Sequence, residues 1–163
     1  MENDELAALA MCVIFCLLAG FVGSIYTAPS IPTWYAALQK PSFNPPNWVF
    51  FPVWTILYIL MGVSLFLVWR QDKHFKRAKT ATALFLAQLA ANTLWSIVFF
   101  GWHDIAGGFI VILILWTLIA ATIISFAKAS KTAATLLVPY ICWVSFATVL
   151  NCSILALNQQ IMP

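Results

Sequence analysis

The sequence predicts an all-α integral membrane protein, a five-transmembrane-helix bundle with a long first loop as its lid. Three observations predict this class: a low content of charged residues, five long apolar runs, and one connection that is longer and richer in proline than the others. Of the 163 residues, 63% are hydrophobic and only 8% are charged. A soluble domain usually carries about a quarter charged residues, so these are too few to cover a surface that faces water.

Five apolar runs each reach the length of about 20 residues that a helix needs to cross a hydrocarbon core of about 30 Å. The eight Lys and Arg residues and the five Asp and Glu residues all lie outside these runs. Pro52 is tolerable in the first turn of the second run, whereas Pro139 interrupts the fifth. We expect a single domain over residues 1–163, with spans at about 6–26, 48–69, 80–102, 105–126 and 133–157 and a lid loop at 27–47.

The basic residues are distributed unequally between the two ends of the predicted bundle. The second and fourth connections share a side with the N-terminus, and the other side holds only Lys40 among the basic residues. This asymmetry predicts that the N-terminus lies inside and the C-terminus outside. The basic residues on the N-terminal side are Arg70, Lys73, Lys76, Arg77, Lys79, Lys128 and Lys131.

The charges also narrow the class of partner. The net charge of +3 is too small to indicate nucleic acid. The basic second connection fits contact with anionic lipid headgroups, although its role in setting the orientation explains it as well. The first run is interpreted as a retained span, because its leading residues are acidic and the run is too long for the core of a signal peptide.

Four cysteines lie inside the apolar runs: Cys12, Cys16, Cys142 and Cys152. Cys12 and Cys16 share a helix face, but a metal site there requires His or carboxylate neighbours, and none is near in the sequence. We therefore interpret the cysteines as buried free thiols that pack as small hydrophobic groups, with no metal site.

The connection between residues 27 and 47 is long, aromatic and rich in proline. Proline fixes φ and removes a backbone donor, so five prolines stiffen this loop. Long structured loops are usually functional, which favours a lid over the helix ends. An aromatic belt at the membrane interface is the alternative, but a belt does not require the prolines. The relevant residues are Pro29, Pro32, Pro41, Pro45 and Pro46, with Trp34, Tyr35, Phe43 and Trp48.

Uncharged polar residues share helix faces with tryptophans in the third and fifth spans. Amides at bilayer depth are expected to face protein or a cavity. Hydrogen bonds between helices are one explanation, and a pocket with apolar walls and a few polar groups is the other. The tryptophans favour the pocket, in which a small Ala147 leaves room for a flat ligand. These residues are Gln88, Asn92, Trp95 and Ser96 in the third span, and Trp143, Ala147 and Asn151 in the fifth.

A stripe of small residues also runs along the third span. Ala83, Ala87 and Ala91 recur at intervals of four. Such a stripe permits close approach of another helix, either in a homodimer seam or within the bundle.

These segments together resemble the TspO/MBR family, which comprises the tryptophan-rich sensory proteins of bacteria and the mitochondrial translocator protein, also called the peripheral benzodiazepine receptor. The resemblance runs in order from about residue 34 to residue 151. Its motifs are Trp34–Pro46, Pro52–Tyr58 followed by Met61 and Gly62, Gln88–Trp95 followed by Phe99–Gly101, Val138–Tyr140 before Trp143, and Phe146 and Ala147 before Leu150 and Asn151.

The resemblance implies a five-helix bundle with a cavity that the first loop caps. It implies binding of porphyrins, haem-related tetrapyrroles and synthetic isoquinoline or benzodiazepine-type ligands, and members are often dimers. No cofactor is required. The family's ligand pocket carries over to Trp54, Asn92, Trp143, Ala147 and Leu150, with Trp34 and Trp48 from the loop, and we add Gln88 and Trp95 from the polar face described above.

Two positions depart from the family pattern. Animal members carry a cholesterol motif with a Tyr and an Arg after the residues that match Leu150 and Asn151, and this chain has neither in the stretch 152–157. Cholesterol is therefore a doubtful ligand. Phe43 replaces the Trp that is usual in the loop. The missing cholesterol motif favours a bacterial cell membrane as the location.

The leading hypothesis is a membrane binding protein, sensor or transporter for porphyrins and related flat hydrophobic ligands. The alternative is an enzyme-like, light-dependent oxidation of bound porphyrin, in which Trp143 is the residue that the family associates with the reaction. Coupled transport or ion conduction ranks last, because the spans contain no ionisable residue of the kind that such coupling uses.

Overall fold

Within residues 3–71 and 75–158, which the computed structural model describes, five helical segments are long and apolar enough to cross a membrane. The side chains of residues 75–78 lie outside this description. The segments are Asn3–Ser30, Asn47–Gln71, Lys79–Gly101, Ile105–Ala127 and Lys131–Asn158. They confirm the predicted five-helix bundle, and the chain is an integral, multi-pass membrane protein.

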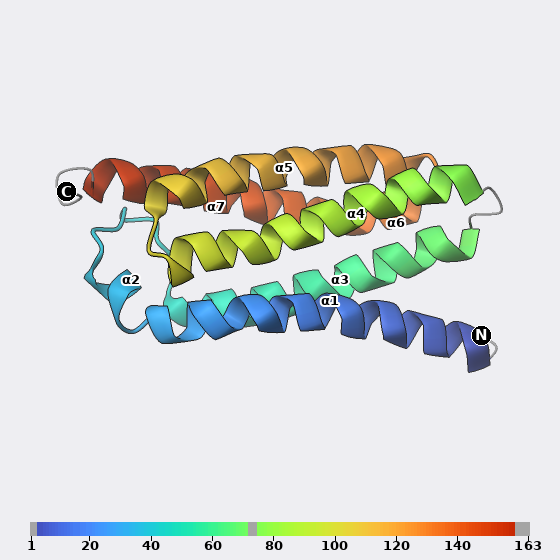
Figure 1. Cartoon of the computed structure of the whole chain (residues 1–163), viewed down its shortest axis with the longest axis horizontal. Helices are drawn as coiled ribbons and strands as arrows, with labels where there is room; N and C mark the ends of the chain where they lie inside the picture. The colour runs from blue at the N-terminus through green and yellow to red at the C-terminus, as the bar shows by residue number, and fades with distance from the viewer. Residues whose placement is uncertain (1–2, 72–74, 159–163) are drawn as a thin grey trace.

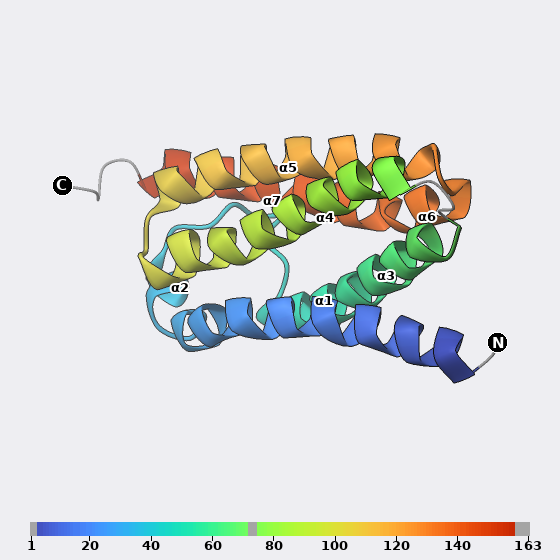
Figure 2. The same cartoon turned by 45° about the vertical axis from the view of Figure 1, so that its right-hand side comes forward.

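The helices lie side by side along the longest axis of the molecule (Figure 1). α4 lies between a pair formed by α1 and α3 and a pair formed by α5 and α7, an arrangement that the turned view also shows (Figure 2). The elements in chain order are α1 (Asn3–Ser30), α2 (Trp34–Ala37), η1 (Asn47–Val49), α3 (Phe50–Gln71), α4 (Phe75–Ser96), η2 (Ile97–Gly101), α5 (Ile105–Ala127), α6 (Lys131–Leu136) and α7 (Val138–Asn158).

The first helix is longer than the sequence predicts. α1 continues through residues 27–30, which the sequence predicts to be part of the loop, and includes Pro29. The fixed φ of proline is compatible with a helix, and only one backbone donor is lost. A tertiary contact holds this end, because the Ser30 hydroxyl donates to the carbonyl oxygen of Phe100 at 2.7 Å. The connection therefore runs from residue 31 to residue 46 and contains the short helix α2.

The predicted interruption near Pro139 is confirmed, and it divides the fifth span into α6 and α7. Proline cannot donate to the carbonyl four residues earlier, so the α-helical pattern breaks just before it. Leu137 instead donates its backbone N–H to the carbonyl of Ala134 at 3.1 Å. The buried Ser64 of α3 donates its hydroxyl to the carbonyl of Ala133 at 2.7 Å, which ties α6 to the bundle.

Close packing between the helices depends on small and aromatic residues. A Cβ on Gly62 would lie 2.5 Å from the Cα of Val13, so only glycine lets α1 and α3 approach this closely. At the other side of the bundle, the rings of Phe85 and Phe126 stack with centroids 5.7 Å apart. Dense packing of this kind holds the helices in one arrangement and leaves space only where side chains do not meet.

The cysteines differ from the prediction in part. Cys16 is buried and Cys12 is half-buried, but Cys142 and Cys152 are exposed on α7. In a membrane protein the outer surface of a spanning helix faces lipid, which accepts a thiol as readily as the core does. Burial inside the protein was the wrong expectation for these two positions.

Candidate ligand-binding cavity

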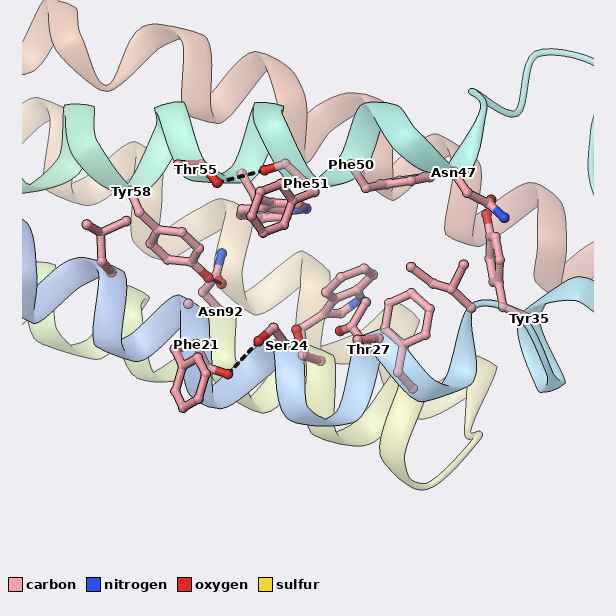
Figure 3. A pocket seen from close by; sticks show the side chains of 18 residues that line it. Phe21, Ser24, Thr27, Tyr35, Asn47, Phe50, Phe51, Thr55, Tyr58 and Asn92 are labelled. Atoms are coloured by element: carbon pink, nitrogen blue, oxygen red, sulfur yellow. Dashed lines mark hydrogen bonds between the residues drawn. The ribbon is translucent and has the colours of Figure 1, made fainter.

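A cavity of about 410 Å³ lies between α1, α3 and α4. Small-molecule sites usually occupy about 300–1,000 Å³, so this volume suits a ligand of moderate size. Figure 3 shows the side chains of Tyr58 and Asn92 at one end of the cavity and those of Tyr35 and Asn47 at the other. We call these the inner end and the loop end.

One wall of the cavity is an aromatic stripe on α3. Phe50, Trp54 and Tyr58 are spaced by four residues, which places them on one face of the helix. Phe51 and Thr55 line the cavity beside them. The rings of Trp54 and Tyr58 lie 5.7 Å apart between centroids, so they form a continuous aromatic surface.

The opposite wall comes from α1 and consists mainly of small residues. Gly20, Ser24, Thr27 and Ala28 line the cavity from this side. A Cβ on Gly20 would overlap the ring of Tyr58, so this glycine makes room for the aromatic wall. Our reading of the sequence missed these residues. Their spacing of three and four within an otherwise bulky apolar helix was the available signal.

A buried chain of hydrogen bonds begins at the inner end of the cavity. The Tyr58 hydroxyl donates to Asn92 Oδ1 at 2.5 Å, and Asn92 Nδ2 donates to the Tyr140 hydroxyl at 2.9 Å. Tyr140 in turn donates to Gln88 Oε1 at 2.9 Å, and Gln88 Nε2 donates to Met61 Sδ at 3.8 Å. The chain joins α3, α4 and α7. Asn92 therefore lines the cavity and also connects helices, whereas Gln88 only connects helices in this structure.

Trp95 lines the cavity from α4 with an indole N–H that lacks an acceptor among the described residues. Its ring stacks on Phe99 with centroids 5.4 Å apart and meets Phe100 edge-on at 5.7 Å. A buried donor without a partner costs roughly 1–3 kcal/mol. An acceptor on a ligand would remove this cost.

The cavity reaches the outer surface between α1 and α3. Phe21 of α1 is 63% exposed and Phe51 of α3 is 79% exposed, yet both line the cavity. Because this surface faces lipid in a membrane protein, the space between the two helices connects the cavity with the bilayer.

Three predicted binding residues of α7 lie outside the cavity walls. Trp143 contacts Phe50 and Phe146, with ring centroids 6.1 and 5.5 Å away, and its indole N–H also lacks an acceptor among the described residues. Ala147 packs against the main core. Leu150 is buried in a second cluster, which includes Tyr35 and Phe99. Their part in ligand binding stays a prediction.

The two loop tryptophans also lie outside the cavity. Trp34 stacks on His103 with centroids 4.5 Å apart and meets Phe99 edge-on. Trp48 is 74% exposed and lies in η1. Of the predicted binding residues, the structure brings Trp54, Asn92 and Trp95 together around one cavity.

The family model described as the TspO/MBR family matches residues 12–157. The chain belongs to the TspO/MBR family. It is 45% identical to a protein named Tryptophan-rich protein TspO from Chlorobaculum tepidum, over 96% of this chain and 99% of the relative. It is 41% identical to a Tryptophan-rich sensory protein from Cereibacter sphaeroides, over 77% of each chain. It is 40% identical to the Translocator protein of Homo sapiens, over 82% of this chain and 80% of the relative.

The loop motif that carries the TspO/MBR resemblance forms an internally bonded structure. The Tyr35 hydroxyl donates to Asn44 Oδ1 at 2.7 Å. Lys40 Nζ donates to the carbonyls of Tyr35, Leu38 and Ala36 at 2.6, 2.8 and 3.2 Å. The Tyr35 carbonyl also accepts from the Leu38 backbone N–H at 3.4 Å, so the Lys40 ammonium adds a second donor there, and a cation interacts favourably with this helix end. The loop is thus built around Lys40.

Membership of the TspO/MBR family supports a membrane-bound sensory or transport role for the chain. Relatives occur in bacteria as well as in animals. Among the described residues, no cluster of three or more His, Cys, Asp or Glu side chains is placed to hold a metal ion.

Proposed function

We propose that the chain binds porphyrins and related flat hydrophobic molecules in the cavity between α1, α3 and α4, and that it senses or transports them. The observation that carries this proposal is the shape and chemistry of the cavity. An aromatic wall on α3 faces small residues of α1, with Trp95 and Phe100 beside them. This arrangement suits a ligand that is flat, aromatic and larger than an amino-acid side chain.

Aromatic stacking supplies the main attraction for such a ligand. Aromatic pairs are worth about 0.5–1.5 kcal/mol each beyond the burial of area. Trp54 and Tyr58 offer ring faces on α3, and Trp95 offers an edge whose N–H has no acceptor in the part of the chain that the structure describes. A carbonyl, carboxylate or ring nitrogen on the ligand would accept from Trp95.

We further propose that the ligand enters from the bilayer. Flat hydrophobic molecules partition into lipid, and the cavity opens between Phe21 and Phe51 on the lipid-facing surface. Such a ligand would reach the site without crossing water. Sensing or facilitated movement both follow from this route.

The orientation and the oligomeric state remain proposals of the same kind. Lys40 lies in the loop at one end of the bundle, while Arg70 and Lys131 mark the other end in α3 and α6. Lys73 and the side chains of Lys76 and Arg77 lie outside the described residues. We propose that the Arg70 end faces the cytoplasm, by the excess of basic residues there.

Homodimer formation through α4 is also proposed. Ala83 and Ala87 are exposed, whereas Ala91 is 9% exposed. The first two therefore offer a flat outer surface to a second copy, and Ala91 packs within the bundle. Crosslinking of Cys residues introduced at Ala83 or Ala87 tests the seam.

A protoporphyrin titration in lipid nanodiscs tests the proposed function. We expect saturable quenching of tryptophan fluorescence, with affinity lowered about 3- to 10-fold by Trp54→Phe or Asn92→Ala. Trp69→Phe is the matched control, because Trp69 is 61% exposed on α3 and does not line the cavity. Quenching equal to that of free tryptophan in empty nanodiscs, or affinities insensitive to both cavity substitutions, would contradict the proposal.

A further inference from the structure

The buried hydrogen-bond chain has a direction, and its far end fixes that direction. Met61 is fully buried and its thioether sulfur has no proton, so it can only accept. The amide group of Gln88 that faces this sulfur must therefore be the NH₂ group, as the 3.8 Å contact between Nε2 and Sδ has it. The opposite orientation would place two acceptors against each other.

The orientation of Gln88 determines every bond up to the cavity. Its Oε1 then faces Tyr140, so the single proton of the Tyr140 hydroxyl is donated to Gln88. The Tyr140 oxygen must accept from Asn92 Nδ2, which turns Asn92 Oδ1 toward Tyr58. The single proton of the Tyr58 hydroxyl is donated in turn to Asn92. Amide orientations are assigned in general from such networks, and here each link leaves one choice.

The consequence appears at the inner end of the cavity. The Tyr58 hydroxyl donates its single proton to Asn92, and its oxygen retains a lone pair that can accept a hydrogen bond. Tyr58 lines the cavity, and its hydroxyl meets Asn92 at the inner end (Figure 3). To donate to a ligand, the Tyr58 hydroxyl would have to break its hydrogen bond to Asn92. Alternatively, every hydrogen bond in the chain would have to reverse, which would place Gln88 Oε1 next to Met61 Sδ. Both alternatives leave buried polar atoms unpaired.

We infer that Met61, acting through Gln88, Tyr140 and Asn92, makes the Tyr58 oxygen an acceptor, so that the inner end of the cavity selects ligands with an N–H or O–H edge. Flat heterocycles that carry an N–H edge fit this end. Those whose edge has only lone pairs do not. This inference rests on the proposed function, because it concerns the ligand of the same cavity.

The acceptor character of the Tyr58 oxygen also orients a ligand that has a hydrogen-bond donor on one edge and only acceptors on another. A carboxylate has only lone pairs and is disfavoured beside the Tyr58 oxygen. The acidic edge of a porphyrin would therefore lie toward the loop end, near Tyr35 and Asn47. Trp95 also lines the cavity, and its N–H, which has no acceptor within residues 3–71 and 75–158, can donate to an acceptor elsewhere on the ligand.

Two pairs of flat tricyclic probes test the polarity with the intact protein in nanodiscs. Carbazole and fluorene have similar shapes, but carbazole has an N–H group where fluorene has a CH₂ group. Their affinity ratio therefore measures the preference for a hydrogen-bond donor. Acridine has a ring nitrogen where anthracene has a C–H group, so their affinity ratio measures the preference for a hydrogen-bond acceptor. Equilibrium dialysis at about pH 8, corrected for partition into empty nanodiscs, gives the four affinities without any reference to porphyrin.

For the unsubstituted protein we expect carbazole to bind about 2- to 10-fold more tightly than fluorene, as one neutral hydrogen bond provides. The ring nitrogen of acridine can accept from Trp95, so the acridine-to-anthracene affinity ratio of the unsubstituted protein serves as the baseline for the variants. Carbazole no tighter than fluorene overturns the inference. This comparison needs no variant.

Met61→Leu tests the control of polarity from a distance. Leucine conserves the volume of methionine but has no acceptor, so the chain of hydrogen bonds is free to take either direction. We expect the acridine-to-anthracene affinity ratio to rise about threefold or more. The carbazole-to-fluorene affinity ratio should fall by up to about twofold, because about half of the molecules would then have Tyr58 as a donor instead of an acceptor. A purely structural role would lower all four affinities together.

Met11→Leu is the matched control, because Met11 is 63% exposed on α1 and takes no part in the hydrogen bonds from Tyr58 to Met61. Both ratios are expected to stay at their unsubstituted values in this variant. Equal ratios in Met61→Leu and Met11→Leu overturn the role of Met61. Loss of porphyrin binding with an intact carbazole-to-fluorene affinity ratio would contradict the proposed function alone. Porphyrin binding with a carbazole-to-fluorene affinity ratio near one would contradict this inference alone.

Discussion

Asn158, the last residue of α7, holds the backbone of Gln39 in the first loop through both atoms of its amide group. Its Nδ2 donates to the Gln39 carbonyl at 2.9 Å, and its Oδ1 accepts from the Gln39 N–H at 3.1 Å. Asn158 is 3% exposed, so water competes little for these bonds. The pair fastens the loop, which follows α1 in the sequence, to the far end of the chain.

Asn158→Ala is expected to loosen the loop over residues 31–46. It removes two hydrogen bonds to the Gln39 backbone and a third to the Ile154 carbonyl within α7, each worth about 0.5–1.5 kcal/mol. If the loop closes the loop end of the cavity, bound porphyrin should dissociate about 5- to 10-fold faster. Hydrogen exchange of the loop amides and stopped-flow dissociation measure the two effects.

Ser153→Ala on the same helix serves as the control. Among the described residues, its hydroxyl donates to the Val149 carbonyl within α7 alone, at 2.9 Å. Unchanged exchange and dissociation are expected for this variant. If Asn158→Ala released ligand no faster than Ser153→Ala did, the loop would not act as a lid.

The loop is also expected to depend on pH through Tyr35. Burial raises the pKa of Tyr35 to about 12 from an ordinary value near 10. A folded-state pKa above the unfolded value means that the protonated form stabilises the fold. This contribution is complete below about pH 10 and is lost as the pH rises from 10 toward 12. Far-UV circular dichroism melts between pH 9 and 12 should show the fall in stability.

Lys40 faces Tyr35 and acts with the opposite sign. Its ammonium lies 4.9 Å from the centre of the Tyr35 ring, and desolvation lowers the pKa of Lys40. A lowered folded-state pKa makes the linked contribution of Lys40 to stability rise with pH in the range just below 10.5. Tyr35→Phe should therefore remove the loss of stability above pH 10. A fall of the same size in Tyr35→Phe would show that another group titrates.

Composition and helix length were enough to predict the spans, because lipid requires long apolar helices with their charges at the ends. The end of α1 was harder to predict, since the bond from Ser30 to Phe100 joins residues far apart in the sequence. The aromatic wall follows from the spacing of Trp54 and Tyr58. For the opposite wall, the spacing of the small residues is the available signal, but the role of Gly20 depends on a ring that comes from another helix.

The predicted polar face of α4 shows the same limit. Gln88, Asn92 and Trp95 share a face as predicted, but helix spacing alone does not say which partner each one meets. Gln88 accepts a hydrogen bond from Tyr140 of α7 and does not line the cavity, whereas Asn92 does line it. Trp48 is close to the loop in sequence, yet η1 turns it outward to 74% exposure. Tertiary contacts therefore determine which of the predicted residues line the cavity.

Gly20→Ala is expected to weaken ligand binding without changing the chemistry of the cavity. The added Cβ would overlap the Tyr58 ring, which must move and strain its bond to Asn92. Overpacking of this kind costs about 1–3 kcal/mol. Protoporphyrin affinity should fall about 5- to 100-fold, measured by fluorescence titration.

Gly23→Ala is a graded control on the same helix. There the nearest atoms to an added Cβ are the Ser96 hydroxyl oxygen at 3.1 Å and the Ser96 Cβ at 3.3 Å, and a shift of a few tenths of an ångström relieves both contacts. Its effect should be several-fold smaller. Similar losses in the two variants would indicate a general shift of α1 rather than a displaced Tyr58.

Phe50→Ala is expected to extend the cavity toward Trp143. The Phe50 ring lines the cavity, and its centroid lies 6.1 Å from that of Trp143, which does not line it. Removing the ring opens a path to the indole N–H of Trp143, which lacks an acceptor among the described residues. Protoporphyrin should gain affinity relative to the smaller anthracene, because only the larger ligand fills the added space.

A double-mutant cycle shows whether Trp143 then contacts the ligand. Trp143→Phe removes the N–H and keeps an aromatic ring. Its effect on protoporphyrin affinity should be larger in the Phe50→Ala background than in the unsubstituted protein, by about 0.5–1.5 kcal/mol for one hydrogen bond. Additive effects would mean that Phe50 does not separate Trp143 from the ligand. A large effect in the unsubstituted protein would instead place Trp143 in the site from the start, as its position in the TspO/MBR motif implies.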